Sequence, residues 1–516
     1  MGSQGKDTAT YHDDFPILHD SRPDDVSIHA FMVSTTRGFL PRMDPIVTLP
    51  AEFDPLESIL QRMPVTTASG EPGLLAQGKG QLGEAVHKEL PDLTEFVDKY
   101  RHDLPLMNAL YRDYSFLASA YLLEPCHERF VIGEEYGLGR QVLPANVARP
   151  IAKCAEICEF KPFMEYAGSY ALFNYRLVDP SLGFSFSEPS NVRLIRAFEH
   201  GLDPTSSEAG FVLVHIDMVR HSGPLVAGAV ASLDACRRST LSSSSTHPEM
   251  TELSARQSLN VSLSQMLAAL KKINAMMETM WKRSKPDDYT SFRTFIFGIT
   301  KQSMFPNGVV YEGLPDSNGR PLSFRGESGA NDSMIPLMDN LLQIPMPDTP
   351  LTKILDDFRS YRPSNHRAFL EWVKRGSEEV GLRRWALALG DSGRGSNDTM
   401  TEEERAEVRH SRSLWIQVLN QVRDFRWRHW CFAREYILKQ TSHPTATGGS
   451  PIVTWLPNQL QAVMGHMMGL YERMGGDEAG GLGEECKDIM ELVRRQDETL
   501  KKEVRKYCEE RGVSGA

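Results

Sequence analysis

The chain has 516 residues, of which 41% are hydrophobic and 24% are charged, and its formal net charge is −11. A chain of this length is too long to fold around one small hydrophobic core, so the sequence predicts two domains. The composition is that of an ordinary globular protein. The acidic balance offers no general basic surface, so we expect no nucleic-acid partner, and the lack of any run of about 18 apolar residues predicts no membrane span.

The N-terminal segment is polar and carries no apolar signal core, so export is not expected. Seven cysteines are few for this length, which is typical of a reducing compartment, and we therefore expect a cytoplasmic protein. Cys154 and Cys158 are four positions apart, but no second pair completes a zinc site, so we interpret them as core residues.

The first 205 residues predict a small helical domain. Residues 1–50 are rich in Asp and Pro and are expected to form a flexible N-terminal segment on the surface. Apolar residues recur at helical spacing over 54–123, with prolines between the helices. Two more helical segments are predicted over 148–160 and 162–175, and the second is dense in aromatic residues.

Residues 206–516 predict a larger helical domain. The mostly apolar segment 211–233 is interpreted as a buried helix with a kink near Gly223-Pro224. The serine-rich stretch 237–254 and the acidic, glycine-containing stretch 390–412 are expected to be mobile insertions. No run of alternating strands and no solenoid repeat is present, so the fold class is predicted to be all-α with long loops.

One helix, predicted over Ser413–Gln440, carries the residues of greatest chemical interest. Its large apolar residues recur at steps of three and four, and His429 lies on that stripe, between Phe425 and Phe432. Arg426 precedes His429 by three positions, so both side chains project from one face. A histidine in apolar surroundings, one turn from a cation, suits an axial haem ligand beside a propionate-binding arginine. A hydrogen-bonded core histidine would give the same local pattern.

The segment 321–333, PLSFRGESGANDS, concentrates small residues. Two interpretations remain open: a plain loop, or a tight backbone segment against a flat ligand, where larger side chains would be in the way. A helix that contains Asp339 is predicted to begin directly after this segment.

Several short motifs follow one another in a distinctive order. They are QVLPANVARP at 141–150, FRTFIFG and GVVYEG within 292–313, SFRGESGA at 323–330, PSNHRAFL at 363–370, R..H at 426–429 and TGGS at 447–450. With these motifs the chain resembles the indoleamine 2,3-dioxygenase family, in a fungal-type form, from about Leu82 to Leu460. The resemblance implies an all-α, two-domain fold that binds one haem b between a small and a large helical domain.

The resemblance also implies a set of cofactor contacts. His429 corresponds to the proximal ligand of the haem iron. Asp339 corresponds to an aspartate close to the haem edge, where a carboxylate near the far nitrogen of the ligand ring would fix its tautomer. Arg426 is expected to pair with a propionate, and Ser328 and Gly329 to form the small-residue segment above the haem.

The implied substrate contacts are distributed along the chain. Arg293 corresponds to the arginine that binds the substrate carboxylate through its planar fork, and Tyr166 to an aromatic wall of the indole pocket. Thr447 and Gly448 correspond to a loop that closes on substrate. His215 lies where many animal members carry a serine, and it is interpreted as a distal contact of the indole N–H, or else as a core histidine bonded to a backbone carbonyl.

The chain departs from the family pattern near Arg293. The family has two adjacent phenylalanines where this chain carries Asp288 and Tyr289. Either Phe292 supplies the aromatic ring, or the pocket is more polar than in other members.

The implied reaction is the insertion of O2 across the indole C2–C3 bond of L-tryptophan, which gives N-formylkynurenine. It needs an electron donor that keeps the iron ferrous, and no side chain is expected to act as an acid or base. One alternative is a family paralogue that acts on a different indole in secondary metabolism. A second alternative is a haem-binding protein with weak catalytic activity.

Overall fold

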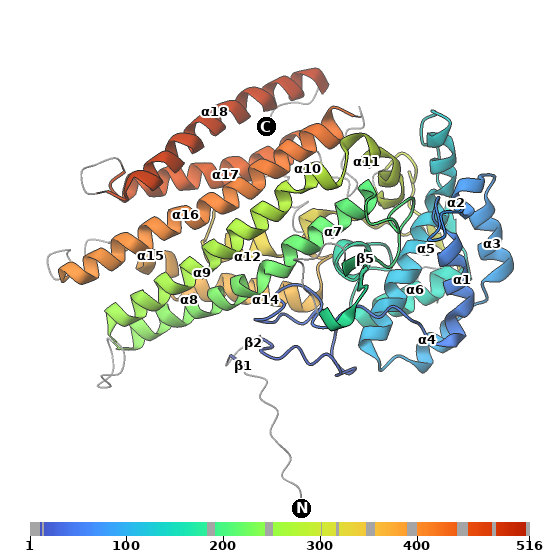
Figure 1. The fold of residues 1–516 in the computed structure, drawn as a ribbon, viewed down its shortest axis with the longest axis horizontal. Coiled ribbons are helices and arrows are strands. Elements are labelled where there is room, and N and C mark those ends of the chain that lie inside the picture. Colours follow the sequence, from blue (N-terminus) through green and yellow to red (C-terminus); the bar gives the residue numbers. More distant parts are fainter. Residues whose placement is uncertain are drawn as a thin grey trace, which may run out of the picture.

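The computed structural model describes residues 11–12, 15–182, 191–242, 251–300, 302–315, 319–346, 357–389, 400–440, 452–476 and 481–511. Helices make up most of these residues, and the predicted all-α fold is confirmed (Figure 1). No helix of this described part is both long and apolar enough to cross a lipid bilayer.

The N-terminal helices pack together at one end of the molecule (Figure 1). Their centre is α5, which is buried along most of its length, its charged residues Arg112 and Asp113 included. The side chain of Asp103 caps its start by accepting a hydrogen bond from the Leu106 amide at 2.9 Å. The six helices are α1 (Asp54–Arg62), α2 (Leu74–Gln77), α3 (Gln81–Glu89), α4 (Thr94–Lys99), α5 (Leu104–Val131) and α6 (Ala145–Cys158).

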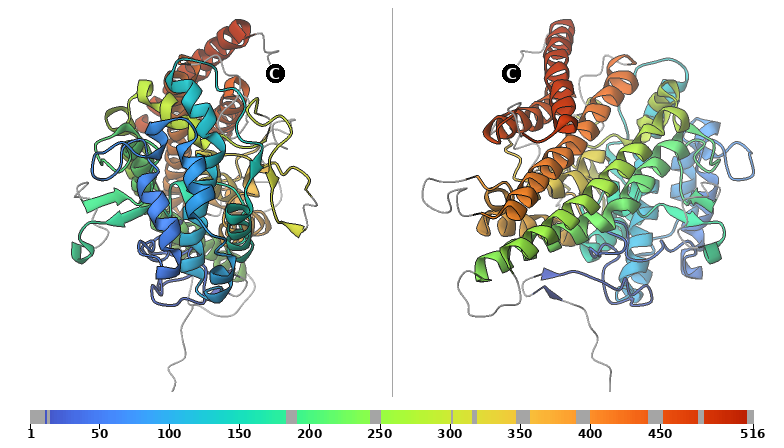
Figure 2. Two further views of the ribbon diagram at one scale, coloured as in Figure 1. Left: turned by 90° about the vertical axis from the view of Figure 1, so that its right-hand side faces the viewer. Right: turned by 60° about the vertical axis from the view of Figure 1, so that its left-hand side comes forward.

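Helices of different lengths form most of the remaining described part, and the long helices α8, α9 and α16 lie side by side (Figures 1 and 2). Asn260 and Asn274 of α9 donate to Glu407 and Gln421 of α16, at a constant offset of 147 residues, so these two helices run in the same direction. The helices are α7 (Ser207–Val219), α8 (Gly223–Ser242), α9 (Glu252–Glu278), α10 (Met280–Arg283), α11 (Pro286–Arg293), α12 (Met334–Leu341), α14 (Ser364–Glu379), α15 (Leu382–Ala386), α16 (Glu402–Phe432), α17 (Ile452–Arg473) and α18 (Glu484–Arg511).

The described strands are short and form three two-stranded sheets. The pairs are β1 (Tyr11–His12) antiparallel to β2 (Phe15–Pro16), β3 (Val142–Leu143) parallel to β6 (Val310–Tyr311), and β4 (Tyr175–Leu177) antiparallel to β5 (Val192–Leu194). Leu177 of β4 pairs with Val192 of β5. The boundary predicted at residue 205 falls just before α7, and the division into two domains stays a prediction.

The long helix predicted over 162–175 is wrong. Only Tyr166–Tyr170 is helical, as a single π-helical turn, η2. Its backbone bonds span five residues, as from the Tyr170 amide to the Glu165 carbonyl at 3.0 Å, and side chains bind further backbone groups. The Glu165 carboxylate accepts from the Ala167 amide at 2.8 Å, and Asn108 donates to the Gly168 carbonyl at 2.9 Å. These tertiary contacts cannot be inferred from the aromatic spacing that suggested a helix.

Helices extend into both predicted insertions. Residues 243–250 and 390–399 lie outside the described residues, but α8 continues to Ser242 and α9 begins at Glu252. Helix α16 begins at Glu402, where Thr401 and Glu404 form a capping box, so 402–412 belong to this helix. The predicted kink near Gly223-Pro224 takes the form of a 3-10 turn, Arg220–Ser222, between α7 and α8.

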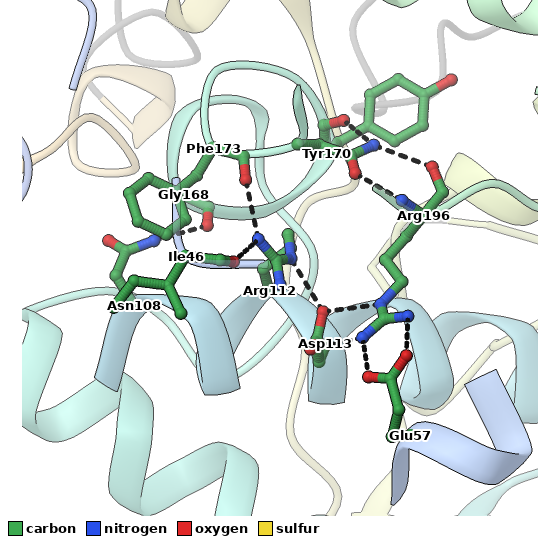
Figure 3. A network of polar contacts seen from close by, with 10 residues as sticks. Ile46, Glu57, Asn108, Arg112, Asp113, Gly168, Tyr170, Phe173 and Arg196 are labelled. Carbon is green, nitrogen blue, oxygen red and sulfur yellow. Dashed lines mark hydrogen bonds and ion pairs between the residues drawn. The ribbon is translucent and has the colours of Figure 1, made fainter. Parts of the chain in front are cut away.

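A buried ion network ties α5 to α1 and to the chain just after β5 (Figure 3). Asp113 of α5 accepts from the Arg112 Nε at 2.7 Å and from two nitrogens of Arg196, at 2.9 and 2.8 Å. Arg196 also donates to Glu57 of α1 at 3.0 Å. Burial opposes the charge on Asp113, but the two guanidinium groups outweigh it and lower the pKa of Asp113 to about 2.

Candidate active site

A cavity of about 1010 Å³ lies where α7, α12, α16 and α17 converge. Its volume lies at the upper end of the range for cofactor and ligand pockets. The predicted residues Tyr166, His215, Gly329, Asp339, Arg426 and His429 all line it. Six positions predicted from separate parts of the chain are therefore brought to one cavity.

His429 lies in the last turn of α16 and faces this cavity. Among the described residues, none makes a hydrogen bond to its ring. Burial is the main cause that lowers the pKa of His429 to about 4, with smaller contributions from His215 and Arg426. The ring is therefore neutral at pH 7 and has a nitrogen lone pair, as a histidine ligand of iron requires.

Arg426 lies one turn before His429, and its Nη2 donates to Oδ2 of Asp339 at 2.6 Å. Its Nε and Nη1, and Oδ1 of Asp339, are buried and have no hydrogen-bond partner among the described residues. Buried donors of this kind are almost always satisfied in native proteins. Either unused guanidinium donor could pair with a carboxylate such as a haem propionate. Asp339 contacts Arg426 rather than the His429 ring, which differs from the contact expected from sequence.

His215 lies on α7, and its Nδ1 is 2.8 Å from the carbonyl oxygen of Phe211. A carbonyl only accepts hydrogen bonds, so Nδ1 is the donor and Nε2 of the neutral ring is left as an acceptor. Burial lowers the pKa of His215, which favours this neutral form. The two interpretations of His215 are compatible, because one nitrogen bonds to the backbone while the ring also lines the cavity.

The small-residue segment forms a 3-10 turn, η8 (Gly329–Asn331), against His215. A Cβ atom added at Gly329 would lie only 3.4 Å from Nε2 of His215. Buried Arg362 holds the segment through the carbonyl oxygens of Ala330 at 3.1 Å and of Asn331 and Asp332 at 3.2 Å. These contacts favour a tight backbone segment over a plain loop. Ser328 caps the turn by accepting from the Ala330 amide.

An aromatic cluster surrounds His215. The Phe211 ring lies 4.9 Å from the His215 ring, 5.2 Å from Tyr289 and 5.7 Å from Phe292, and Tyr166 meets His215 edge-on at 5.8 Å. Both candidate rings, Tyr289 and Phe292, therefore belong to the cluster. The polar neighbour, Asp288, is instead exposed and accepts a hydrogen bond from the hydroxyl of half-buried Ser207.

Two residues of this site, Phe211 and Arg362, were not predicted from the sequence. Phe211 precedes His215 by four positions, so helical spacing placed it on the same face and could have indicated it. Arg362 gives no such signal, because its contacts join residues about 30 positions apart.

Arg293 ends α11 and is only 1% exposed. Its guanidinium lies 4.7 Å from the centre of the Phe297 ring, and it is not among the residues that line the described cavity. Its role as a substrate clamp stays a prediction. Thr447 and Gly448 lie outside the described residues.

The described residues contain no cluster of three or more His, Cys, Asp or Glu side chains that could hold a bare metal ion. The cavity is instead lined by two neutral histidines, of which His429 makes no hydrogen bond to a described residue, and by Arg426, which has unused donors. This arrangement fits a metal carried by an anionic macrocycle, in which the protein supplies an axial ligand and pairs the acid groups.

Comparison with known proteins leads to the same family as the motifs. The family model described as indoleamine 2,3-dioxygenase matches residues 27–480. Indoleamine 2,3-dioxygenase nanC of Aspergillus nanangensis is 25% identical over 374 residues, which cover 71% of this chain and 80% of that protein. Indoleamine 2,3-dioxygenase 1 of Mus musculus is 24% identical, with 64% and 70% covered. The 6-hydroxytryptophan 2,3-dioxygenase fscD of Fusarium equiseti is 22% identical, with 67% and 74% covered.

The family match covers most of the chain and includes each predicted cavity residue from Tyr166 to His429. The motif order, the helical fold and this match agree with one another. The chain therefore belongs to the indoleamine 2,3-dioxygenase family, whose members are haem-dependent dioxygenases that act on indoles.

Proposed function

We propose that this protein binds haem b and adds both atoms of O2 across the indole C2–C3 bond of L-tryptophan, which releases N-formylkynurenine. The observation that carries the proposal is one cavity lined by His429, Arg426, His215 and Gly329. When bound, the ferrous haem supplies the oxygen chemistry. An external electron donor is needed to keep the iron in that state.

Two groups of α16 would hold the cofactor. His429 offers a neutral ring nitrogen to the iron, because burial keeps its pKa near 4. Arg426 would donate from Nε or Nη1 to a propionate, while its Nη2 remains bonded to Asp339. The Asp339 contact would hold the guanidinium in a single orientation before the cofactor binds.

Other side chains would orient the substrate. With Nδ1 bonded to the Phe211 carbonyl, His215 presents Nε2 as an acceptor for the indole N–H. Gly329 leaves room beside that nitrogen, and the aromatic cluster around Phe211 would exclude water from the indole ring. The protein would contribute binding and orientation, and no side chain would act as an acid or base.

A related indole is the second candidate substrate. The Tyr166 hydroxyl is buried and has no hydrogen-bond partner among the described residues, and Tyr166 lines the cavity. A hydroxyl on the indole ring would satisfy this group. One relative is named as a 6-hydroxytryptophan 2,3-dioxygenase, so hydroxylated tryptophans belong in the substrate test.

The deciding experiment is an absorption spectrum of the haem-reconstituted, reduced protein with O2 and each substrate in turn. We expect a Soret band together with growth of the near-ultraviolet band of N-formylkynurenine when L-tryptophan is added. Product from another indole alone would identify a paralogue with a different substrate. A Soret band without product from any indole would indicate a catalytically weak haem protein, and the absence of a Soret band would contradict the proposal.

Replacing Arg293 with alanine is expected to raise KM for L-tryptophan about 10- to 100-fold, because a buried charge-assisted contact to the substrate carboxylate would be lost. Arg293→Lys keeps the charge but not the planar fork and should give an intermediate value. Steady-state kinetics with tryptamine, which lacks the carboxylate, supplies the control. An equal effect on tryptamine and L-tryptophan would remove the carboxylate clamp from the proposal.

A further inference from the structure

The C-terminal helix α18 contacts both α16 and α17 and forms one edge of the molecule (Figures 1 and 2). It begins at Glu484, beyond the residues 27–480 that match the family model. Four hydrogen bonds that share one register, each joining positions 73 residues apart, link α18 to α16 and to η10 (Ala433–Leu438), the π-helical segment that continues α16. The contacting pairs are Ser413 and Cys486, Arg423 and Gln496, Trp430 and Glu503, and Leu438 and Arg511.

Glu503 of α18 accepts hydrogen bonds from two residues on this face, Trp430 and Arg434. One of its carboxylate oxygens accepts from the Trp430 indole nitrogen at 2.7 Å, and the other accepts from Arg434 at 2.5 Å. Trp430 is completely buried, and its ring meets the edge of Tyr507 of α18, with 6.1 Å between centroids. Trp430 lies in α16 and Arg434 about one turn later in η10, so a single carboxylate holds the turn at which α16 passes into the π-helical segment.

That turn begins next to His429. On the other side of His429, Arg428 donates to Glu278 of α9 at 2.8 Å. Positions 428 and 430 project about 200° apart around a helix, so α16 is tied from two sides where it presents His429 to the cavity. The Glu278 side chain is 54% exposed, which weakens its ion pair, whereas Glu503 is 24% exposed and bonds to a buried indole.

We propose that Glu503 is a positioning residue for the haem ligand. Through Trp430 and Arg434 it sets the rotation of the α16 turn that carries His429. The inference rests on the proposed role of His429 as the iron ligand. It assigns a part in cofactor binding to a helix that lies outside the residues matched by the family model.

The expected effect follows from the behaviour of other residues that orient metal ligands, whose removal typically costs 10- to 100-fold in affinity. Glu503→Leu should raise the rate of haem loss by about tenfold and shift the iron–histidine stretching band of the ferrous protein. Glu503→Gln keeps one acceptor oxygen and should give a smaller shift. Trp430→Phe keeps the ring packing but removes the N–H, and it should shift the band in the same direction.

The experiment uses the full-length, haem-loaded protein. Resonance Raman spectra of the ferrous state report the iron–histidine band, and haem transfer to an excess of acceptor protein reports the dissociation rate. Exposed Glu498 lies on the same helix, so Glu498→Gln should leave both measurements unchanged. Leu500→Ala removes a buried α18 side chain and should lower thermal stability without shifting the band.

The outcomes separate this inference from the proposed function. An equal band shift in Glu503→Leu and Leu500→Ala would show that Glu503 only stabilises α18, and the inference would be wrong. An unchanged band and an unchanged rate of haem loss in Glu503→Leu would also overturn it, while the function of the wild-type protein would stand. A haem-loaded wild-type protein without any iron–histidine band would refute His429 as ligand, and the inference with it. If Glu503→Leu does not fold, Glu503→Gln and Trp430→Phe provide the same comparison.

Discussion

Replacing His429 with alanine is expected to abolish stable haem binding. The ring is the cavity-lining group that best matches an axial ligand, since it is neutral and makes no hydrogen bond to any described residue. Without it, only the contacts of Arg426 and the apolar walls would retain the cofactor. After reconstitution and desalting, the ratio of haem to protein should fall from near one to near zero, as measured by the Soret absorbance.

The matched control for this variant is His410→Ala. His410 is exposed on the same helix, α16, so its removal should leave the Soret band at the wild-type intensity. Imidazole added to His429→Gly should restore much of the band, because a free ligand can occupy the space left by the side chain. A His429→Ala protein that keeps the wild-type spectrum would refute His429 as the ligand.

The second large effect is expected on stability rather than on chemistry. Asp113→Ala should lower the free energy of unfolding by about 3–5 kcal/mol, because removing one partner of a buried ion pair leaves the other charge buried without compensation. The change would leave Arg112 and Arg196, which are 0% and 5% exposed, without the carboxylate between them. Chemical unfolding of the haem-free protein at pH 7 measures the effect. Glu57→Gln provides the control and should cost much less, because Glu57 is 27% exposed.

The Asp113 carboxylate should also make the free energy of unfolding depend on pH. The folded-state pKa of Asp113 is about 2, below the ordinary value of 3.8. A depressed pKa means that the network stabilises the folded state above pH 4 and loses this contribution as the pH falls toward 2. The difference in stability between the wild-type protein and Asp113→Asn should therefore shrink below pH 4. A difference that stays constant from pH 7 to pH 2 would contradict the low pKa.

Much of the fold and of the cavity lining could be predicted from the sequence. The spacing of apolar residues is a local property, so it correctly placed His429 and Arg426 on one face of a long helix. The order of the short motifs identified the family, and the family match over 27–480 confirmed it. Local spacing failed over 162–175, where a single π-helical turn, supported by hydrogen bonds from Asn108 and to the Glu165 carboxylate, stands in place of a longer helix.

By itself, then, the sequence determined the all-α class, the family and the shared face of His429 and Arg426, because these depend on helical periodicity and short motifs. Only the tertiary structure decided what each side chain contacts. Arg426 bonds to Asp339, 87 positions away, and Glu503 reaches Trp430 across 73 positions. Such contacts form only when the helices pack side by side. The periodicity of a single helix specifies which face is buried, but it carries no information about which neighbour covers that face.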